Sequence, residues 1–366
     1  MRRTHSRSPS RTPRDAAGAA RRGASRRERD PKQSVARPAA PLPPAHPALL
    51  AAALIAAACV LAAVTFRIID TDFWQHLAVG RALWSTHAIP HTELWSWPTY
   101  GEPALLRSWA FRALLWPFWE AGELNGLFAW RWITTLLAFG LAWATARRMG
   151  ARGLTPLVVV VLCGLVYRQR SQVRPETLAS VLLALTMWLL ARTRDAAATP
   201  GADPPRRGRL VWLIPVVWMW ANAHITYVLA FVLLGIRLVE AHLEAWRGTP
   251  RGPGPRALWL VTAACALAAC INPFGWRALW QPFDFLLHWR DTALFQGIGE
   301  LRAVGWSGNE TNGVFLLLLG WPLLLLWRSR RDVAGILTCA FFTAYALPSQ
   351  RFLAMYALAA APYVGR

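Results

Sequence analysis

Apolar runs recur along this chain and alternate with short polar segments, many of them rich in arginine. A helix of about 20 apolar residues crosses the hydrocarbon core of a bilayer, and shorter runs are typical of tilted or broken membrane helices. The pattern predicts about ten membrane helices and therefore an all-α, polytopic membrane protein. We place these helices at 47–66, 127–146, 154–166, 177–190, 210–220, 227–239, 258–271, 314–327, 333–347 and 352–364.

The segment between the first two spans, 67–120, has a different character. It is rich in Trp, His and Pro and contains no clean span. Residues 105–119 are mostly apolar, but Arg107, Arg112 and Pro117 interrupt them. A run of this kind is typical of a helix that lies along the membrane surface, so we predict an interfacial helix in the first outer loop.

The first 46 residues are basic, rich in Ser, Pro and Ala, and almost without large apolar side chains. Such a segment cannot bury a core, so we predict a disordered tail over 1–46 and an integral membrane domain over 47–366. We expect the tail to lie in the cytoplasm and to touch anionic lipid, with no nucleic acid as partner. The apolar run from residue 47 exceeds a signal-peptide core and predicts an uncleaved anchor.

The distribution of arginine predicts the orientation in the membrane. A cytoplasmic tail makes the first helix run outward. The later loops that this orientation places in the cytoplasm are all basic, and they lie near 147–152, 192–209, 247–256 and 328–331. Because these loops agree independently with one orientation, we expect the loops at 167–175 and 272–312 to face away from the cytoplasm.

Composition narrows the classes of function. The 366 residues are 55% hydrophobic and include 22 Trp. Trp is favoured at the headgroup level of a bilayer, which agrees with a membrane protein. The five Cys all fall in apolar runs without a C-x-x-C pair, which indicates neither a disulfide framework nor a zinc site. A Walker loop, a G-x-S-x-G elbow and a Rossmann fingerprint are missing, which disfavours an NTP-driven pump.

Two acids and a histidine follow the first predicted span. If a helix begins at Thr71, Asp72 and His76 lie four residues apart on one face, close to Asp70. Two carboxylates and an imidazole suit a divalent cation such as Mg²⁺ or Mn²⁺, or a general base. Asp70 also suits an N-cap and Asp72 the first turn of a helix, so a purely structural role stays open.

Arginines on the predicted outer face depart from the usual enrichment of Lys and Arg in cytoplasmic loops. The loop 168–174 carries Arg168, Arg170 and Arg174, and Arg351 begins the last predicted helix. Guanidinium groups hold phosphate through paired hydrogen bonds, but they also reach toward lipid headgroups, and both roles stay open. His224 lies at a turn between two spans on the same face, where a buried, hydrogen-bonded histidine is the alternative to a ligand-binding one.

Several short motifs occur in a fixed order from about residue 47 to the end. They are Asp70-x-Asp72-x-Trp74-x-His76-Leu77 with Gly80-Arg81, Val173-Arg174-Pro175, Trp220-Ala221-Asn222-x-His224, Asn272-Pro273-x-Gly275 and Arg351-Phe352. In this order they resemble the GT-C superfamily of membrane glycosyltransferases. The likeness is greatest to a largely uncharacterised bacterial branch with a D-x-D-x-W-x-H-L start. It is more distant to protein O-mannosyltransferases and aminoarabinose transferases.

The resemblance implies transfer of a hexosyl or pentosyl group from a polyprenyl-phosphate-linked donor to a glycan, lipid or protein acceptor. It places the protein in a bacterial inner or plasma membrane, with a site facing the periplasm or exterior. It implies catalytic roles for Asp70, Asp72 and His76, with Asp70 and Asp72 as metal ligands if a cation is used. The implied substrate-binding residues are Arg170, Arg174, His224, Arg351, Trp74 and Trp109, although a place in the interfacial Trp belt is the alternative for the two tryptophans.

One departure from the family pattern bears on activity. Members of the branch often carry H-E-W in the interfacial helix, where this chain has Arg107-Ser108-Trp109. Two other functions therefore stay open: a transporter or flippase for a lipid or small solute, and a non-catalytic membrane assembly protein. A transporter is expected to place charges near the membrane midplane, where Arg131 and Arg237 are the candidates.

Overall fold

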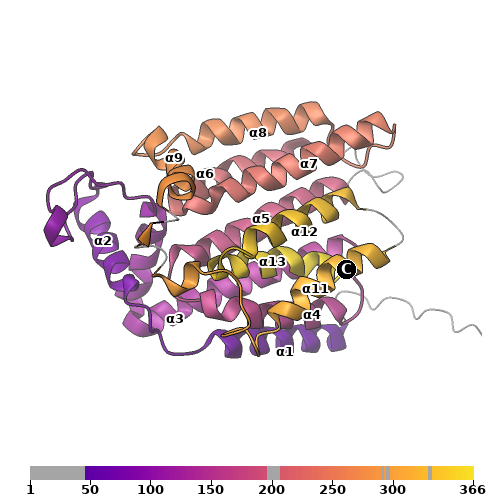
Figure 1. Ribbon diagram of the computed structural model, residues 1–366, viewed down its shortest axis with the longest axis horizontal. Coiled ribbons are helices and arrows are strands. Elements are labelled where there is room, and N and C mark those ends of the chain that lie inside the picture. Colours follow the sequence, from indigo (N-terminus) through magenta and orange to yellow (C-terminus); the bar gives the residue numbers. More distant parts are fainter. Residues whose placement is uncertain (1–45, 196–206, 290–291, 294–296, 329–331) are drawn as a thin grey trace, which may run out of the picture. The chain divides into compact units, whose positions relative to one another are not determined.

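The computed structural model describes residues 46–195, 207–289, 292–293, 297–328 and 332–366, and most of these are helical (Figure 1). The α-helices are α1 (Pro47–Val64), α2 (Asp72–Thr86), α3 (Trp109–Arg148), α4 (Thr155–Tyr167), α5 (Pro175–Asp195), α6 (Leu213–Ala223), α7 (Val228–Trp246), α8 (Pro255–Ala269), α9 (Trp276–Asp284), α11 (Val314–Trp327), α12 (Val333–Ala346) and α13 (Leu353–Val364). Apart from His46, the tail predicted over 1–46 lies outside the described residues.

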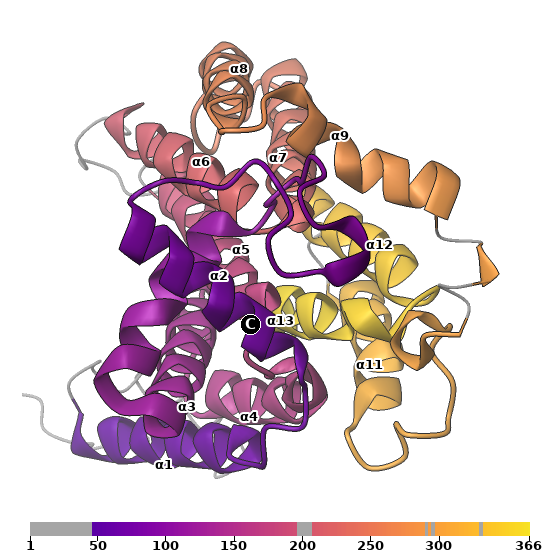
Figure 2. The same ribbon diagram turned by 90° about the vertical axis from the view of Figure 1, so that its left-hand side faces the viewer.

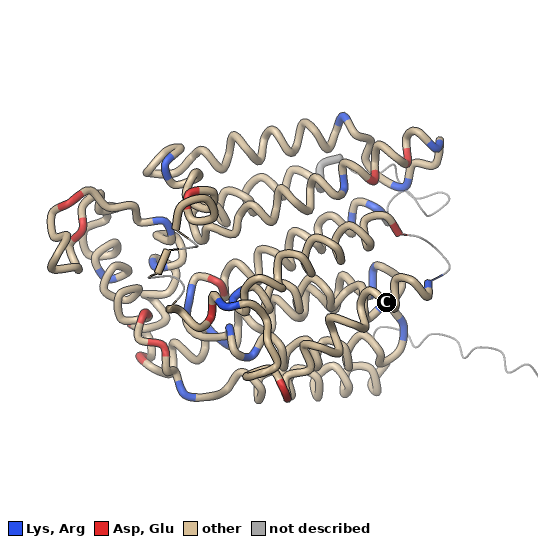
Figure 3. Tube along the Cα trace, in the orientation of Figure 1, with Lys and Arg blue, Asp and Glu red and all other residues tan. Residues whose placement is uncertain are grey.

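The predicted all-α membrane fold is confirmed. Each of the ten predicted spans falls on a helix, namely α1, α3 to α8 and α11 to α13. Four helical stretches are long and apolar enough to cross a bilayer: Pro47–Val64, Trp109–Arg148, Pro175–Arg194 and Ile225–Trp246. Figure 3 shows charged positions gathered toward the ends of the helices and largely missing along their middles. This distribution is that of a membrane protein.

The core of the helical domain forms around α13. Every residue from 353 to 362 is buried, and a helix that is apolar on all sides belongs inside a bundle. Its run of small residues lets α3, α4, α5, α11 and α12 approach closely, and Figure 2 shows α13 among them. Beside it α3 packs along α5, where the Trp130 indole donates a hydrogen bond to Thr177 at 2.9 Å.

The predicted interfacial helix at 105–119 begins at Trp109 and forms the first part of α3. Gly122 and Glu123 leave helical geometry, with φ of −160° and 47°, so this part is set off from the following membrane span. The break turns the chain back on itself. A Cβ added at Gly126 would lie 1.6 Å from the Phe118 carbonyl oxygen, so glycine is required at that position. Within the same loop α2 packs against α3.

Gly126→Ala should destabilise the protein, because the added methyl group would force apart two backbone segments that meet at the α3 break. Overpacking of this kind typically costs about 1–3 kcal/mol. Gly140→Ala is the matched control in the same helix, since a Cβ there meets nothing within 4 Å. Thermal unfolding of the purified variants in detergent checks this, and equal melting temperatures for the two variants would contradict the close approach at Gly126.

Candidate functional site

One end of the bundle gathers most of the residues singled out from the sequence. The loop after α1, the starts of α2, α3 and α5, the turn after α6 and the start of α13 all meet there. A cavity of about 310 Å³ lies between them, within the size range of small-molecule sites. Its lining residues are Asp72, His76, Leu105, Arg107, Ser108, Arg112, Arg174, Pro175, Glu176, His224, Ile225 and Arg351.

Arg174 connects three acidic residues at the edge of this cavity. Its Nε donates a short hydrogen bond to Asp70, its Nη2 lies 3.3 Å from Asp72, and its Nη1 lies 3.0 Å from Glu300. Asp70 also accepts from the Asp72 amide at 3.1 Å, so it anchors the start of α2. Burial raises the pKa of Asp70, but the hydrogen bonds from Arg174 and the Asp72 amide, together with the positive charge of Arg174, hold the pKa below its ordinary value. Asp70 is therefore ionised and committed to Arg174.

Glu176 gathers a second set of charges, and sequence reasoning missed it. It lies in the first turn of α5 and is 6% exposed. Arg351 donates to it from Nη2 at 2.6 Å and from Nε at 3.1 Å, and Arg170 lies 3.7 Å away. The only signal in the sequence was its place directly after Arg174-Pro175, where an acid is ordinarily explained by the helix dipole.

Glu300 links the two sets of charges. It contacts Arg170, Arg174 and Arg351, the last at 3.5 Å. Burial raises the pKa of Glu300, but the charge and hydrogen bond of Arg170, together with the charges of Arg351 and Arg174, hold the pKa below its ordinary value. Glu300 belongs to the segment 272–312, and the structure places it beside these three arginines.

The two histidines of the cavity are neutral at physiological pH. Burial and the neighbouring Arg112 lower the pKa of His76 to about 4, and the Arg112 Nε donates to the His76 ring at 3.3 Å. Burial likewise lowers the pKa of His224 to about 4, against the opposing charge of Glu176 at 3.8 Å. His224 also contacts the Thr226 hydroxyl at 2.7 Å. Each imidazole therefore acts as a neutral hydrogen-bonding group.

The structure brings together some predicted residues and leaves others outside the cavity. Asp72, His76, Arg174, His224 and Arg351 line it. Asp70 and Arg170 stand directly behind this lining through their ion pairs. Trp74 is 55% exposed and packs edge-on against Trp119, and Trp109 donates to Asn222 at 2.8 Å. Neither tryptophan is among the lining residues, so stacking on a sugar stays a prediction.

A divalent cation does not fit the two aspartates as they are arranged. Asp70 and Asp72 share the Arg174 guanidinium, whose positive charge occupies the position that a cation would take between them. The described residues contain no group of three or more His, Cys, Asp or Glu that would hold a metal. Metal binding at this pair stays a prediction, and it requires Arg174 to move away.

The departure from the family motif lies within the cavity wall. Arg107 and Ser108 both line it, together with Arg112 from the next turn. Neither Arg107 nor Arg112 forms an ion pair within 4.0 Å with any described residue, unlike Arg174 and Arg351. A second cavity of about 370 Å³ adjoins the first and shares Leu105, Arg107 and Arg112 with it, so these two arginines stand between the two spaces.

Comparison with solved structures shows what this fold resembles. Over 86% of this chain, the oligosaccharyltransferase of Archaeoglobus fulgidus tethered to an acceptor peptide matches with a TM-score of 0.58 and 13% identity. The archaeal oligosaccharyltransferase AglB of the same organism, in complex with an inhibitory peptide and a dolichol-phosphate, matches over 86% with a TM-score of 0.56 and 12% identity. These matches cover 48% and 49% of the archaeal chains, so this chain spans about half their length.

ArnT from Cupriavidus metallidurans bound to undecaprenyl phosphate matches over 87% of this chain and 59% of its own, with a TM-score of 0.49 and 16% identity. No protein-family model and no curated protein sequence matches this chain. The fold of the archaeal oligosaccharyltransferases extends over most of this chain, and the GT-C-like fold predicted from the sequence is confirmed. Identities this low show a shared fold alone.

Acidification should destabilise the protein through His76 and His224. Between pH 6.5 and about 4 the unfolded chain binds protons that the folded histidines do not, so stability falls as the pH is lowered through this window. Each buried histidine contributes at most on the order of 3 kcal/mol to this loss.

The melting temperature in detergent, followed from pH 7.5 to pH 5, measures this effect. Replacing both histidines with Gln should flatten the pH dependence. His242→Gln changes an exposed histidine on α7, and the melting temperature of this variant should depend on pH as steeply as that of the original protein. An unchanged slope in the double variant would show that other groups cause the loss.

Proposed function

We propose that this protein is a membrane glycosyltransferase that moves a sugar from a polyprenyl-phosphate-linked donor to an acceptor at its non-cytoplasmic face. The observation that carries the proposal is the cavity at one end of a GT-C-like fold, whose lining combines the exposed carboxylate of Asp72 with several arginines. The dolichol-phosphate bound by the archaeal protein of the same fold supports a lipid-phosphate donor.

Asp72 is the best candidate for the general base. Its carboxylate is 62% exposed and keeps a single ion-pair contact, to Arg174 at 3.3 Å, within the described residues. The Asp70 carboxylate is only 7% exposed and already engaged by Arg174. Asp72 can therefore reach an acceptor hydroxyl, while Asp70 positions the guanidinium and the start of α2.

Arg107 and Arg112 are the best candidates for holding the donor phosphate. The charges of Arg174 and Arg351 are already balanced by Asp70, Glu176 and Glu300. Arg107 and Arg112 form no ion pair within 4.0 Å with a described residue, and Asp284 and Glu93 act on them only over longer distances, so both guanidinium groups stay open to an incoming anion. In this arrangement His76 accepts a hydrogen bond from Arg112 and fixes its direction.

The proposed reaction follows from these positions. The acceptor hydroxyl oxygen attacks the anomeric carbon of the sugar while Asp72 takes its proton. The bond between that carbon and the phosphate oxygen breaks, and its electron pair leaves on the phosphate. Arg107 and Arg112 stabilise the added negative charge on the departing lipid phosphate. The cationic wall thus lowers the energy of the leaving group, and the carboxylate raises the reactivity of the nucleophile.

Asp72→Asn should abolish transfer while the protein still accumulates in membranes, because an amide cannot take the proton and the side chain is largely exposed. General-base loss typically costs about 10²–10⁴-fold in rate. The measurement is mass spectrometry of envelope glycans, glycolipids and glycoproteins in a deletion strain of the source organism that expresses each variant.

Glu120→Gln is the matched control, since Glu120 is an exposed acid on α3 that lies outside the cavity lining. The original protein and this control should restore the missing sugar, and Asp72→Asn should not. Full restoration by Asp72→Asn would remove the general base from the proposal and favour a transporter or an assembly protein.

Arg107→Gln combined with Arg112→Gln should weaken binding of undecaprenyl phosphate by at least about tenfold, since a hydrogen bond to a charged group contributes about 1.5–3 kcal/mol. Titration of the purified protein in detergent, followed by native mass spectrometry, measures this affinity. Arg277→Gln changes an exposed arginine on α9 away from the cavity and should bind as the original protein does. Equal affinity for all three proteins would place the phosphate elsewhere.

A further inference from the structure

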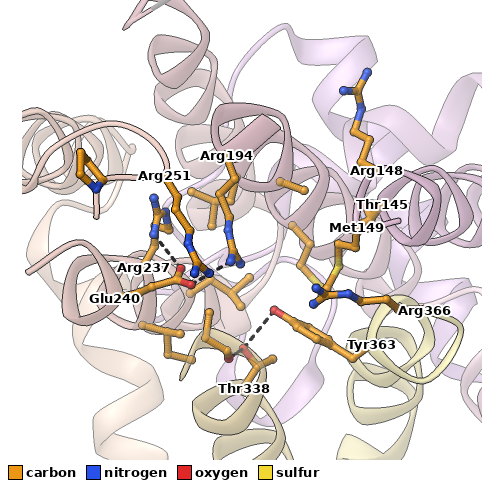
Figure 4. A pocket seen from close by; sticks show the side chains of 17 residues that line it. Thr145, Arg148, Met149, Arg194, Arg237, Glu240, Arg251, Thr338, Tyr363 and Arg366 are labelled. Carbon is orange, nitrogen blue, oxygen red and sulfur yellow. Dashed lines mark hydrogen bonds and ion pairs between the residues drawn. The ribbon is translucent and has the colours of Figure 1, made fainter. Parts of the chain in front are cut away.

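A second cationic cavity lies at the opposite end of the helices. Its volume is about 330 Å³, and the ends of α3, α5, α7 and α13 surround it together with the start of α12 (Figure 4). The 21 residues of α5, about 30 Å of helix, separate it from the candidate site, because Glu176 lies in the first turn of α5 and Arg194 in the last. The two cavities therefore do not share residues.

Arginine dominates the polar lining of this cavity. Five arginines from different segments line it, namely Arg148, Arg194, Arg237, Arg251 and Arg366, and the guanidinium of Arg148 points away from the others (Figure 4). Glu240 is the one acid among the described lining residues, and it is already held by Arg237 at 2.6 Å and by Arg194 at 2.9 Å. The lining therefore carries an excess of positive charge.

The carboxylates just behind the lining do not remove this excess. Asp332 is shared by Arg366 at 2.8 Å and Arg194 at 3.8 Å, and Glu244 lies 3.5 Å from Arg237. The Arg237 side chain is 3% exposed, and its Nε has no hydrogen-bond partner among the described residues. A buried donor without a partner indicates that the site accommodates a further acceptor.

The loop between α7 and α8 brings another guanidinium to the site. Gly252 packs so closely that a Cβ there would lie 2.7 Å from the Arg237 Nη2, which places the loop directly against that side chain. The neighbouring Arg251 lines the cavity, and its guanidinium has no ion-pair partner within the described part of the chain. Arg251 is therefore available to an anion that enters.

The remaining lining is apolar. Met149, Met187, Leu190, Leu233 and Ile236 form much of the wall. A small inorganic anion gains nothing from such a surface, whereas a molecule with a charged head and a hydrocarbon part gains from both. This combination, at one end of helices that cross a membrane, matches the chemistry of a lipid.

We propose that this cavity binds the phosphate group of an anionic phospholipid, with guanidinium groups on the phosphate and the start of an acyl chain along the apolar wall. Guanidinium offers paired donors in the geometry that phosphate oxygens accept. Arg251 is the main binding residue, and the Arg237 Nε offers a further donor, while Glu240 holds the guanidinium groups of Arg194 and Arg237 in position. The assignment is independent of the glycosyltransferase proposal, because it involves none of the residues of the candidate site.

Native mass spectrometry of the full chain, released from nanodiscs of equal parts phosphatidylglycerol and phosphatidylcholine, tests this site. We expect selective retention of phosphatidylglycerol, and a loss of at least about threefold in that retention for Arg251→Gln. Arg247→Gln is the control, because it changes an exposed arginine close by that does not line the cavity. The Arg251 guanidinium has no ion-pair partner among the described residues, and its backbone hydrogen bond to Glu244 does not depend on the side chain, so the variant should keep the melting temperature of the original protein.

A second arm adds inorganic phosphate at millimolar concentration. Retention of the lipid in its presence supports a lipid headgroup, whereas displacement of the lipid supports a phosphate site filled from solution. Equal retention of the two lipids by the original protein would overturn the proposal. So would unchanged retention in Arg251→Gln combined with Arg194→Gln when that variant remains folded.

Discussion

The ion pairs of one guanidinium hold the candidate site together. Arg174 binds Asp70 and Asp72 from the first loop and Glu300 from the segment before α11, partners more than 100 residues away along the chain. Without that charge, three carboxylates would face one another in a partly buried space, an arrangement that is strongly unfavourable. Because its ion pairs also fix the start of α2, Arg174 determines where the one largely exposed carboxylate, Asp72, stands.

This pattern of ion pairs indicates which arginines of the cavity lining can bind the donor phosphate. Arg174 and Arg351 form ion pairs with acids and therefore have little net charge to offer a ligand. Arg107 and Arg112 form no such close ion pair with a described residue. Arg107-Ser108 in place of H-E therefore changes the charge of the cavity lining at this position and still supplies polar side chains there. A histidine and a glutamate at these positions would be neutral and negative, so this chain presents a more cationic surface there than a chain with H-E-W would.

The sequence predicted the helices well because an apolar run is a local pattern. It predicted the site only in part because the partners of a side chain can lie far away along the chain. Each apolar run became a helix, and Asp72, Arg174, His224 and Arg351 lie together as their shared outer face implied. Glu176 was missed because an acid at a helix start has an ordinary explanation. The back-folded break at Gly122 and Glu123 depends on contact with Phe118, which no local pattern reveals.

An experimental structure of the full chain with undecaprenyl phosphate tests the central claim most directly. The account predicts the phosphate within hydrogen-bonding distance of Arg107 and Arg112, with Asp72 on the opposite wall and the Arg174 ion pairs intact. A phosphate bound by Arg174 or Arg351, with Asp70 or Glu176 released from its arginine, would contradict it.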